Sequence, residues 1–176
     1  MRRIRTFKVL MVGDGGVGKT TLLDAYRTGE FREHEITIGL NLATCKVQLE
    51  DGRKFKFCIF DMSGQTRFVR MILQISNLVK GANGALLVFD LSALPTLHAL
   101  DPWVKEIRDA NGDIPLVLVG AKADLEKEVT DEDIKHFMNK HNISVYVETS
   151  SKLLLNVDKP FKILAQKIDE ALRGSA

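Results

Sequence analysis

Residues 7–20 read FKVLMVGDGGVGKT, and this stretch decides how the chain begins to fold. The segment 7–12 is a mostly apolar strand pattern, and GDGGVGKT (13–20) follows it without a break. A helical pattern, TLLDAY (21–26), comes next. A strand, a glycine-rich loop and a helix form the context in which G-x-x-x-x-G-K-[ST] binds phosphate. The sequence therefore predicts a phosphate-binding loop.

The residue types of this loop suit phosphate chemistry. Glycines let the backbone N–H groups approach phosphate oxygens closely, and the start of the helix adds partial positive charge. Lys19 is expected to reach the β- and γ-phosphates, and the Thr20 hydroxyl to hold Mg²⁺. The motif does not choose between ATP and GTP. The predicted loop residues are Gly13, Asp14, Gly15, Gly16, Val17, Gly18, Lys19, Thr20 and Thr21.

Short buried-strand patterns alternate with helical ones along the rest of the chain. The expected strands are 7–12, 84–91, 115–120 and 143–148, with a hairpin near 42–60. The expected helices are 18–29, 94–110, 131–141 and 159–172, with Thr130 as an N-cap. This order predicts a doubly wound α/β fold in one domain, 1–176. Its six-stranded, mostly parallel sheet has one antiparallel edge strand and helices on both faces.

Charge and hydropathy exclude several other classes of protein. A net charge of +2 does not fit a dedicated nucleic-acid binder. No apolar run approaches the roughly 20 residues that span a bilayer, and no secretory signal opens the chain. The expected location is cytoplasmic. The basic N-terminal segment MRRIRTFK (1–8) is either a solvated lead-in or a weak contact for phosphate or an anionic membrane surface.

The two cysteines, Cys45 and Cys58, flank the predicted turn at Asp51-Gly52. A register that aligns the apolar residues of the hairpin on one face puts the two cysteines on opposite faces. Free thiols in a reducing compartment are therefore expected rather than a disulfide.

A second chemical motif is IFDMSGQ (59–65). An apolar strand that ends in Asp61 presents a carboxylate to the Mg²⁺ shell opposite a phosphate loop. Gly64 permits close approach to a γ-phosphate, and Gln65 stands where an amide can orient the attacking water. Alone, D-x-x-G-Q would be read as a turn after an edge strand; after a phosphate loop, the functional interpretation is favoured.

Taken together, these motifs resemble those of the Ras-like small GTPases, Ras and Rab proteins most closely. The resemblance runs from Phe7 to about Leu172. GDGGVGKT is similar to the family's phosphate loop, DMSGQ to its DTAGQ, AKAD (121–124) to its NKxD and ETSSK (148–152) to its ETSAK. Thr37 is similar to the threonine that binds Mg²⁺ only while the γ-phosphate is present.

The resemblance implies a guanine-binding site. Asp124 would accept hydrogen bonds from guanine N1–H and the 2-amino group, and the backbone at Ser151 and Lys152 would donate to O6. Taken singly, some of these residues have ordinary interpretations: Thr37 as a strand residue, Phe31 as packing, the serines as turn formers. The expected base contacts and supports are Phe31, Lys122, Asp124, Leu125, Ser150, Ser151 and Lys152.

Ala121 departs from the family pattern, which has asparagine there. The asparagine would bond around guanine N7 and brace the phosphate loop, and alanine can do neither. A neutral hydrogen bond contributes roughly 0.5–1.5 kcal/mol, so the lost base contact alone is expected to lower affinity by up to about tenfold, and loss of the brace to lower it further. Weaker nucleotide binding and faster spontaneous release than in the family's other members are therefore expected. Adenine has no donors for the Asp124 carboxylate, so the guanine preference is expected to remain.

The resemblance also implies a switch that hydrolyses GTP slowly, in signalling or vesicle trafficking. Effectors, GTPase-activating proteins and exchange factors would bind near 30–42 and 62–80, where residues 71–75 are rich in apolar side chains. A monomer with a peripheral membrane contact is expected. One alternative is a nucleotide-binding scaffold, or pseudo-GTPase, with little turnover. Another is an ATP-using P-loop enzyme.

Overall fold

The computed structural model describes residues 4–35, 38–62, 64 and 76–175. Its centre is a sheet in the order β2-β3-β1-β4-β5-β6. The strands are β1 (Arg5–Val12), β2 (Leu40–Gln48), β3 (Lys54–Met62), β4 (Gly84–Asp90), β5 (Leu116–Ala121) and β6 (Tyr146–Glu148). Only the β2–β3 pair is antiparallel among the described pairs. The predicted fold class is confirmed.

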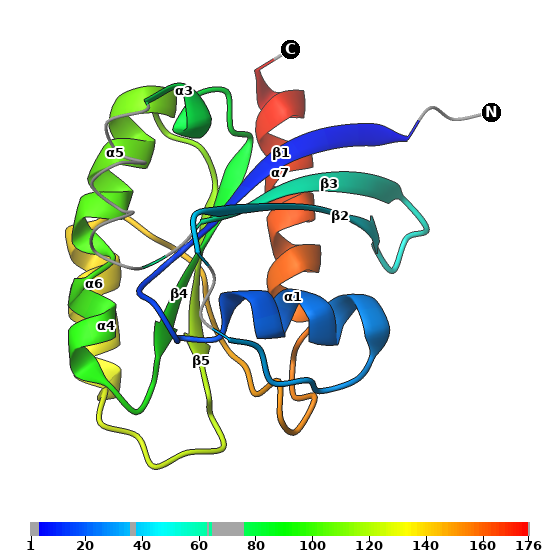
Figure 1. Cartoon of the computed structure of the whole chain (residues 1–176). Helices are drawn as coiled ribbons and strands as arrows, with labels where there is room; N and C mark the ends of the chain where they lie inside the picture. The colour runs from blue at the N-terminus through cyan, green and yellow to red at the C-terminus, as the bar shows by residue number, and fades with distance from the viewer. Residues whose placement is uncertain (1–3, 36–37, 63, 65–75, 176) are drawn as a thin grey trace.

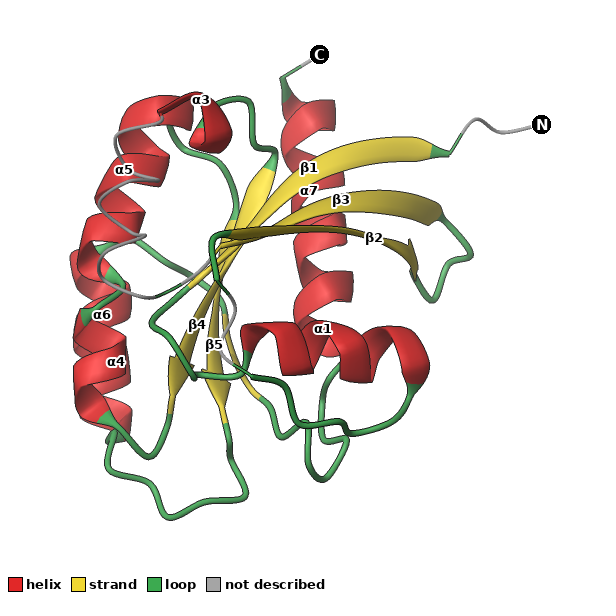
Figure 2. Cartoon of the chain, viewed as in Figure 1, coloured by secondary structure: helices red, strands yellow, loops and turns green. Residues whose placement is uncertain are grey.

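Helices cover both faces of the sheet (Figures 1 and 2). One face carries α1 (Lys19–Thr28) and α7 (Lys159–Gly174). The other carries α3 (Ser76–Val79), α4 (Leu94–His98), α5 (Asp101–Asn111) and α6 (Asp131–Lys140). Thr130 caps α6 as predicted, because its hydroxyl accepts a hydrogen bond from Asp133 N–H while the Asp133 carboxylate accepts one from Thr130 N–H.

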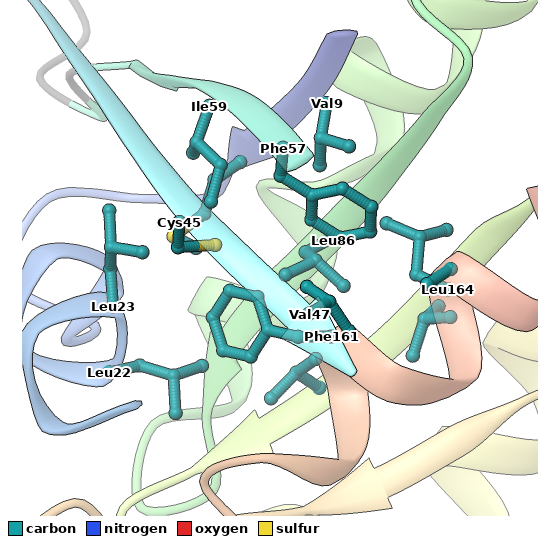
Figure 3. Close-up of a cluster of buried hydrophobic side chains, with 14 of the residues drawn as sticks. Val9, Leu22, Leu23, Cys45, Val47, Phe57, Ile59, Leu86, Phe161 and Leu164 are labelled. Carbon is teal, nitrogen blue, oxygen red and sulfur yellow. The ribbon is translucent and has the colours of Figure 1, made fainter. Parts of the chain in front are cut away.

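Alternation along β1 divides the core between these two layers. Val9 faces α1 and α7 and Leu10 faces the opposite layer, and both are fully buried. Figure 3 shows the first of the two clusters, where side chains of β1, β2, β3 and β4 meet those of α1 and α7. Strands buried on both sides explain the continuous apolar runs in the sequence.

The hairpin has the register that separates its cysteines. Cys45 lies opposite Phe57, and Cys58 lies opposite Thr44. Cys45 is buried in the first cluster, whereas Cys58 is on the other face and partly exposed, and both thiols are free. The prediction from the apolar pattern is confirmed, although the strands extend to 40–62 rather than 42–60.

Two of the expected elements have other boundaries in the structure. The helix expected over 94–110 is two helices, α4 and α5, because Pro102 in the first turn of α5 has no N–H to continue a helix through it. The strand expected over 143–148 begins only at Tyr146, since Ile143 N–H bonds back to Met138 at the end of α6. In the described part of the chain, no helix is long and apolar enough to span a bilayer.

Candidate functional site

The loop between β1 and α1 lies where the central strand ends. β1 pairs with β3 on one side and β4 on the other, so the loop opens at the carboxyl edge of three parallel strands. That edge is where ligands bind in doubly wound sheets. Gly13 packs so closely on β4 that a Cβ there would stand 2.1 Å from the Val88 carbonyl oxygen. Only glycine fits this contact.

Lys19 is held in the loop by its own backbone. Its Nζ donates to the carbonyl oxygens of Gly13 and Asp14, at 2.9 Å each. Burial lowers the pKa of Lys19 to about 8, while Asp61 and Asp14 work in the opposite direction. An anionic phosphate beside this buried ammonium would compensate the loss of water around it.

Asp61 and Thr20 face each other across the start of α1. The Thr20 hydroxyl donates to Asp61 Oδ2 at 2.5 Å. The Asp61 carboxylate is fully buried, and its Oδ1 has no hydrogen-bond partner among the described residues. Burial raises the pKa of Asp61, although the Thr20 hydroxyl and the Lys19 ammonium oppose this shift. A buried carboxylate with an unused oxygen beside a hydroxyl is a donor set that fits Mg²⁺, which prefers oxygen ligands.

Gly64 rests directly on the phosphate loop. A Cβ at this position would come within 2.1–2.2 Å of backbone atoms of Gly13, Asp14 and Gly15. The backbone after β3 therefore approaches the loop as closely as chain geometry allows. The approach of Gly64 to a γ-phosphate, which the sequence suggested, stays a prediction. Thr37 and Gln65 lie outside the described residues.

The expected base-binding end is built from the loops after β5 and β6. The Ser150 hydroxyl donates to Asp124 Oδ1 at 2.6 Å, which orients that carboxylate. Ser150 is itself fixed, because its backbone pairs with Leu155 in both directions. Within the described chain, no protein acceptor is recorded for the N–H groups of Ser151 and Lys152. These two donors can therefore serve a ligand.

A cavity of about 390 Å³ joins the two ends of the site. Of the predicted residues, Gly13, Asp14, Asp61 and Ser150 do not line it but contact or adjoin residues that do. Ala121 lies in its wall as the last residue of β5. The lining residues are Gly15, Gly16, Val17, Gly18, Lys19, Thr20, Thr21, Phe31, Glu33, His34, Glu35, Gly64, Ala121, Lys122, Asp124, Leu125, Ser151 and Lys152.

Some of these residues were missed from the sequence. Glu33, His34 and Glu35 line the cavity from the segment after α1, and His34 Nε2 lies 2.7 Å from Asp24 Oδ2. This charged segment lacks the apolar periodicity of a strand or a helix, so the sequence did not indicate that it lines the cavity. Asp90, at the end of β4, was also missed; its carboxylate pairs with Lys122.

The Thr149 hydroxyl stands out as a buried group without a partner. Thr149 is 1% exposed, and its Oγ1 makes no hydrogen bond within the described residues. Thr149 N–H donates to the Gly120 carbonyl at 2.8 Å, so Thr149 continues the parallel ladder opposite Ala121. The short side chain at position 121 offers no polar atom to this hydroxyl.

Comparison with known proteins agrees with this geometry. The Ras family model matches residues 8–170. The Ras-related protein RABA2a of Arabidopsis thaliana is 40% identical over 166 residues, which cover 92% of this chain and 74% of that protein. The Ras-related protein YPTC6 of Chlamydomonas reinhardtii is 39% identical over 166 residues, which also cover 92% of this chain and 74% of that protein. The chain therefore belongs to the Ras family of small GTPases, and the predicted resemblance is confirmed.

Replacing Thr149 by valine is expected to stabilise the nucleotide-free protein. Valine keeps the shape of threonine and removes a buried hydroxyl whose desolvation is not compensated, which should raise the free energy of unfolding by about 1 kcal/mol. Urea unfolding followed by circular dichroism measures this change. Ser150→Ala is the control, because it removes a hydroxyl that has a partner and should not stabilise the protein. A less stable Thr149→Val variant would contradict the expectation.

Proposed function

We propose that this chain is a guanine-nucleotide switch that binds GTP with Mg²⁺ and hydrolyses it slowly to GDP. One observation carries the proposal: a single cavity has a phosphate loop at one end and the Ser150-oriented carboxylate of Asp124 at the other. Guanine has two adjacent donors, N1–H and the 2-amino group, that suit a carboxylate. Adenine would leave the carboxylate unpaired, which sites of this kind reject strongly.

The phosphates would be held by the loop 13–20 and by the residues that surround it. The loop 13–20 would direct its backbone N–H groups and the N-terminus of α1 at the phosphate oxygens. Lys19 would exchange its two carbonyl acceptors for phosphate oxygens. The Thr20 hydroxyl and the Asp61 carboxylate would hold Mg²⁺, with Thr37 as the expected third protein ligand. When bound, Mg²⁺ supplies neutralisation of the charge that develops on the β- and γ-phosphates.

Hydrolysis would depend on positioning and charge stabilisation. Gln65 would orient the attacking water, and Gly64 would present its backbone N–H to the γ-phosphate. A partner's arginine would accelerate the step by about 10³–10⁵. The segments that hold Thr37 and Gly64 would keep one arrangement only with GTP bound, so effectors, GTPase-activating proteins and exchange factors would bind near 30–42 and 62–80. We further propose that the chain acts as one domain, as a monomer at a cytoplasmic membrane surface.

A single-turnover assay of phosphate release tests this function. With GTP and Mg²⁺ we expect slow first-order release, on the order of 10⁻⁴ per second as in unassisted Ras-type enzymes, and none with ATP. Gln65→Leu should slow release at least about tenfold, because the water loses its orienting amide. Gln166→Leu is the matched control, since Gln166 is exposed on α7, where it bonds Glu170.

The other outcomes of this assay separate the alternatives. Bound GTP that persists without phosphate release would support a scaffold without turnover. Release from ATP at a rate similar to that from GTP would contradict guanine recognition by Asp124. Equal rates for Gln65→Leu and the unsubstituted protein would remove the glutamine from the mechanism.

Replacing Ala121 by asparagine is expected to slow the release of GDP by up to about tenfold. The added amide can reach the base and supply a hydrogen bond of roughly 0.5–1.5 kcal/mol. Displacement of a fluorescent GDP analogue by excess GDP measures the rate. Ala121→Ser is the control, because its hydroxyl is too short to reach the base and its rate should stay near that of the unsubstituted protein. An unchanged or faster release from Ala121→Asn would contradict this role of position 121.

A further inference from the structure

Asp90 is a buried carboxylate that the phosphate-binding machinery does not use. It is the last residue of β4, is 7% exposed, and lies directly opposite Ala121 of β5. β4 and β5 are neighbouring strands of the sheet (Figure 1). Asp90 does not line the nucleotide cavity. Its position next to the cavity wall raises the question of what the carboxylate does there.

The Asp90 carboxylate is held in one orientation. Its Oδ1 accepts hydrogen bonds from the Ser92 N–H at 2.8 Å and the Ser92 hydroxyl at 2.6 Å. The Asp90 N–H donates to the Thr96 hydroxyl oxygen at 2.9 Å. Burial alone would raise the pKa of Asp90, but the contacts with Lys122 and Ser92 outweigh it and hold the pKa below its usual value. Asp90 is therefore a fixed anion.

The remaining oxygen of Asp90 holds the end of a lysine side chain that does line the cavity. Asp90 Oδ2 lies 2.7 Å from Lys122 Nζ. The other end of Lys122 is also fixed. Its backbone is in the left-handed region, with φ of 60°, and bonds on both sides hold this turn: Ala123 N–H donates to Thr149 O, and Leu125 N–H donates to Lys122 O, at 3.0 Å each.

Fixing both ends of Lys122 has a consequence for the base-binding end of the cavity. Lys122 lines the cavity next to Ala121, and its aliphatic stem lies between the two fixed ends. A free lysine would have to lose rotamer freedom when a base packs on it, whereas a tethered one has already lost it. The ion pair with Asp90 also occupies the ammonium, so the Asp124 carboxylate remains available to the donors of a base.

We infer that Asp90 is a positioning residue for the guanine base, which acts by tethering Lys122 along the cavity wall. The inference rests on the proposed function. The tethered Lys122 would give the site a second contact that is fixed before the base binds. The first is the Asp124 carboxylate, which Ser150 orients. Ala121, next to Lys122, provides no polar atom. Asp90 itself does not touch the nucleotide. The carboxylate therefore affects the nucleotide only through Lys122.

A double-mutant cycle between Asp90 and Lys122 tests the inference on the full chain, prepared without nucleotide. Asp90→Asn keeps the shape of the side chain and removes its charge. It should speed GDP release by about threefold to tenfold, the range expected for the ordering of one long side chain. Lys122→Met keeps an apolar stem but has no ammonium to tether. In the Lys122→Met background, Asp90→Asn should produce no further change in the rate.

Two additional variants separate positioning from a structural role. Ser92→Ala loosens the carboxylate without removing it, and its smaller effect on GDP release should also vanish in the Lys122→Met background. Asp101→Asn is the matched control: it breaks an ion pair with Lys140 outside the cavity and should leave GDP release unchanged. Circular dichroism checks that each variant is folded.

The tether also has a readout that needs no nucleotide. Reductive methylation with ¹³C-formaldehyde should modify the Lys122 amine faster in Asp90→Asn than in the unsubstituted protein, because the amine is no longer paired. Equal methylation rates would overturn the tether. If Asp90→Asn speeds GDP release equally in the unsubstituted protein and in Lys122→Met, the positioning role is overturned, although the tether itself is not. A failure of the unsubstituted protein to bind GDP in the same experiment would overturn the proposed function, and the inference with it.

Discussion

The parallel pairing of β1 with β3 and β4 is the constraint on which the site depends. β1 is buried between these two strands, so its end cannot shift without disrupting both ladders. The phosphate loop therefore begins at a fixed point, with Val88 of β4 in contact with Gly13 and Asp61 of β3 opposite Thr20. Because three strands end at one edge, residues far apart in the sequence meet there without any loop having to be long.

The pairing of charged side chains is the second feature that shapes the site. Lys19 is held by backbone carbonyls, Asp61 by a hydroxyl, Asp124 by the Ser150 hydroxyl and Lys122 by Asp90. Each charged side chain thus has a partner that fixes its direction in the absence of a ligand. Preorganised polar groups of this kind contribute to binding because little reordering is needed when the ligand arrives. The side chain of Ala121 offers no polar group of this kind, and the neighbouring Thr149 hydroxyl has no hydrogen-bond partner within the described residues.

Most of the fold and much of the cavity could be predicted from the sequence. Strand and helix periods identified the elements, and short motifs at the strand ends gave the lining residues of the phosphate loop and of the segments after β5 and β6. The boundaries and site residues that the sequence did not predict depend on information outside these patterns. The break between α4 and α5 depends on a proline in a first turn, and the short β6 on a backbone bond from Ile143 to α6. The tertiary fold brings three residues to the cavity, Glu33, His34 and Glu35, and places Asp90 next to its wall. The local periodicity of the sequence does not predict these positions.

The central claim is that Asp124 selects guanine without help from an asparagine at position 121. Competition for the nucleotide-free protein between a fluorescent GDP analogue and unlabelled GDP or ADP tests it most directly. The account predicts that ADP displaces the analogue only at concentrations about 10⁴-fold higher than GDP, because adenine leaves the Asp124 carboxylate unpaired. Displacement by ADP within about tenfold of the GDP concentration, a gap that a single neutral hydrogen bond could explain, would contradict the claim.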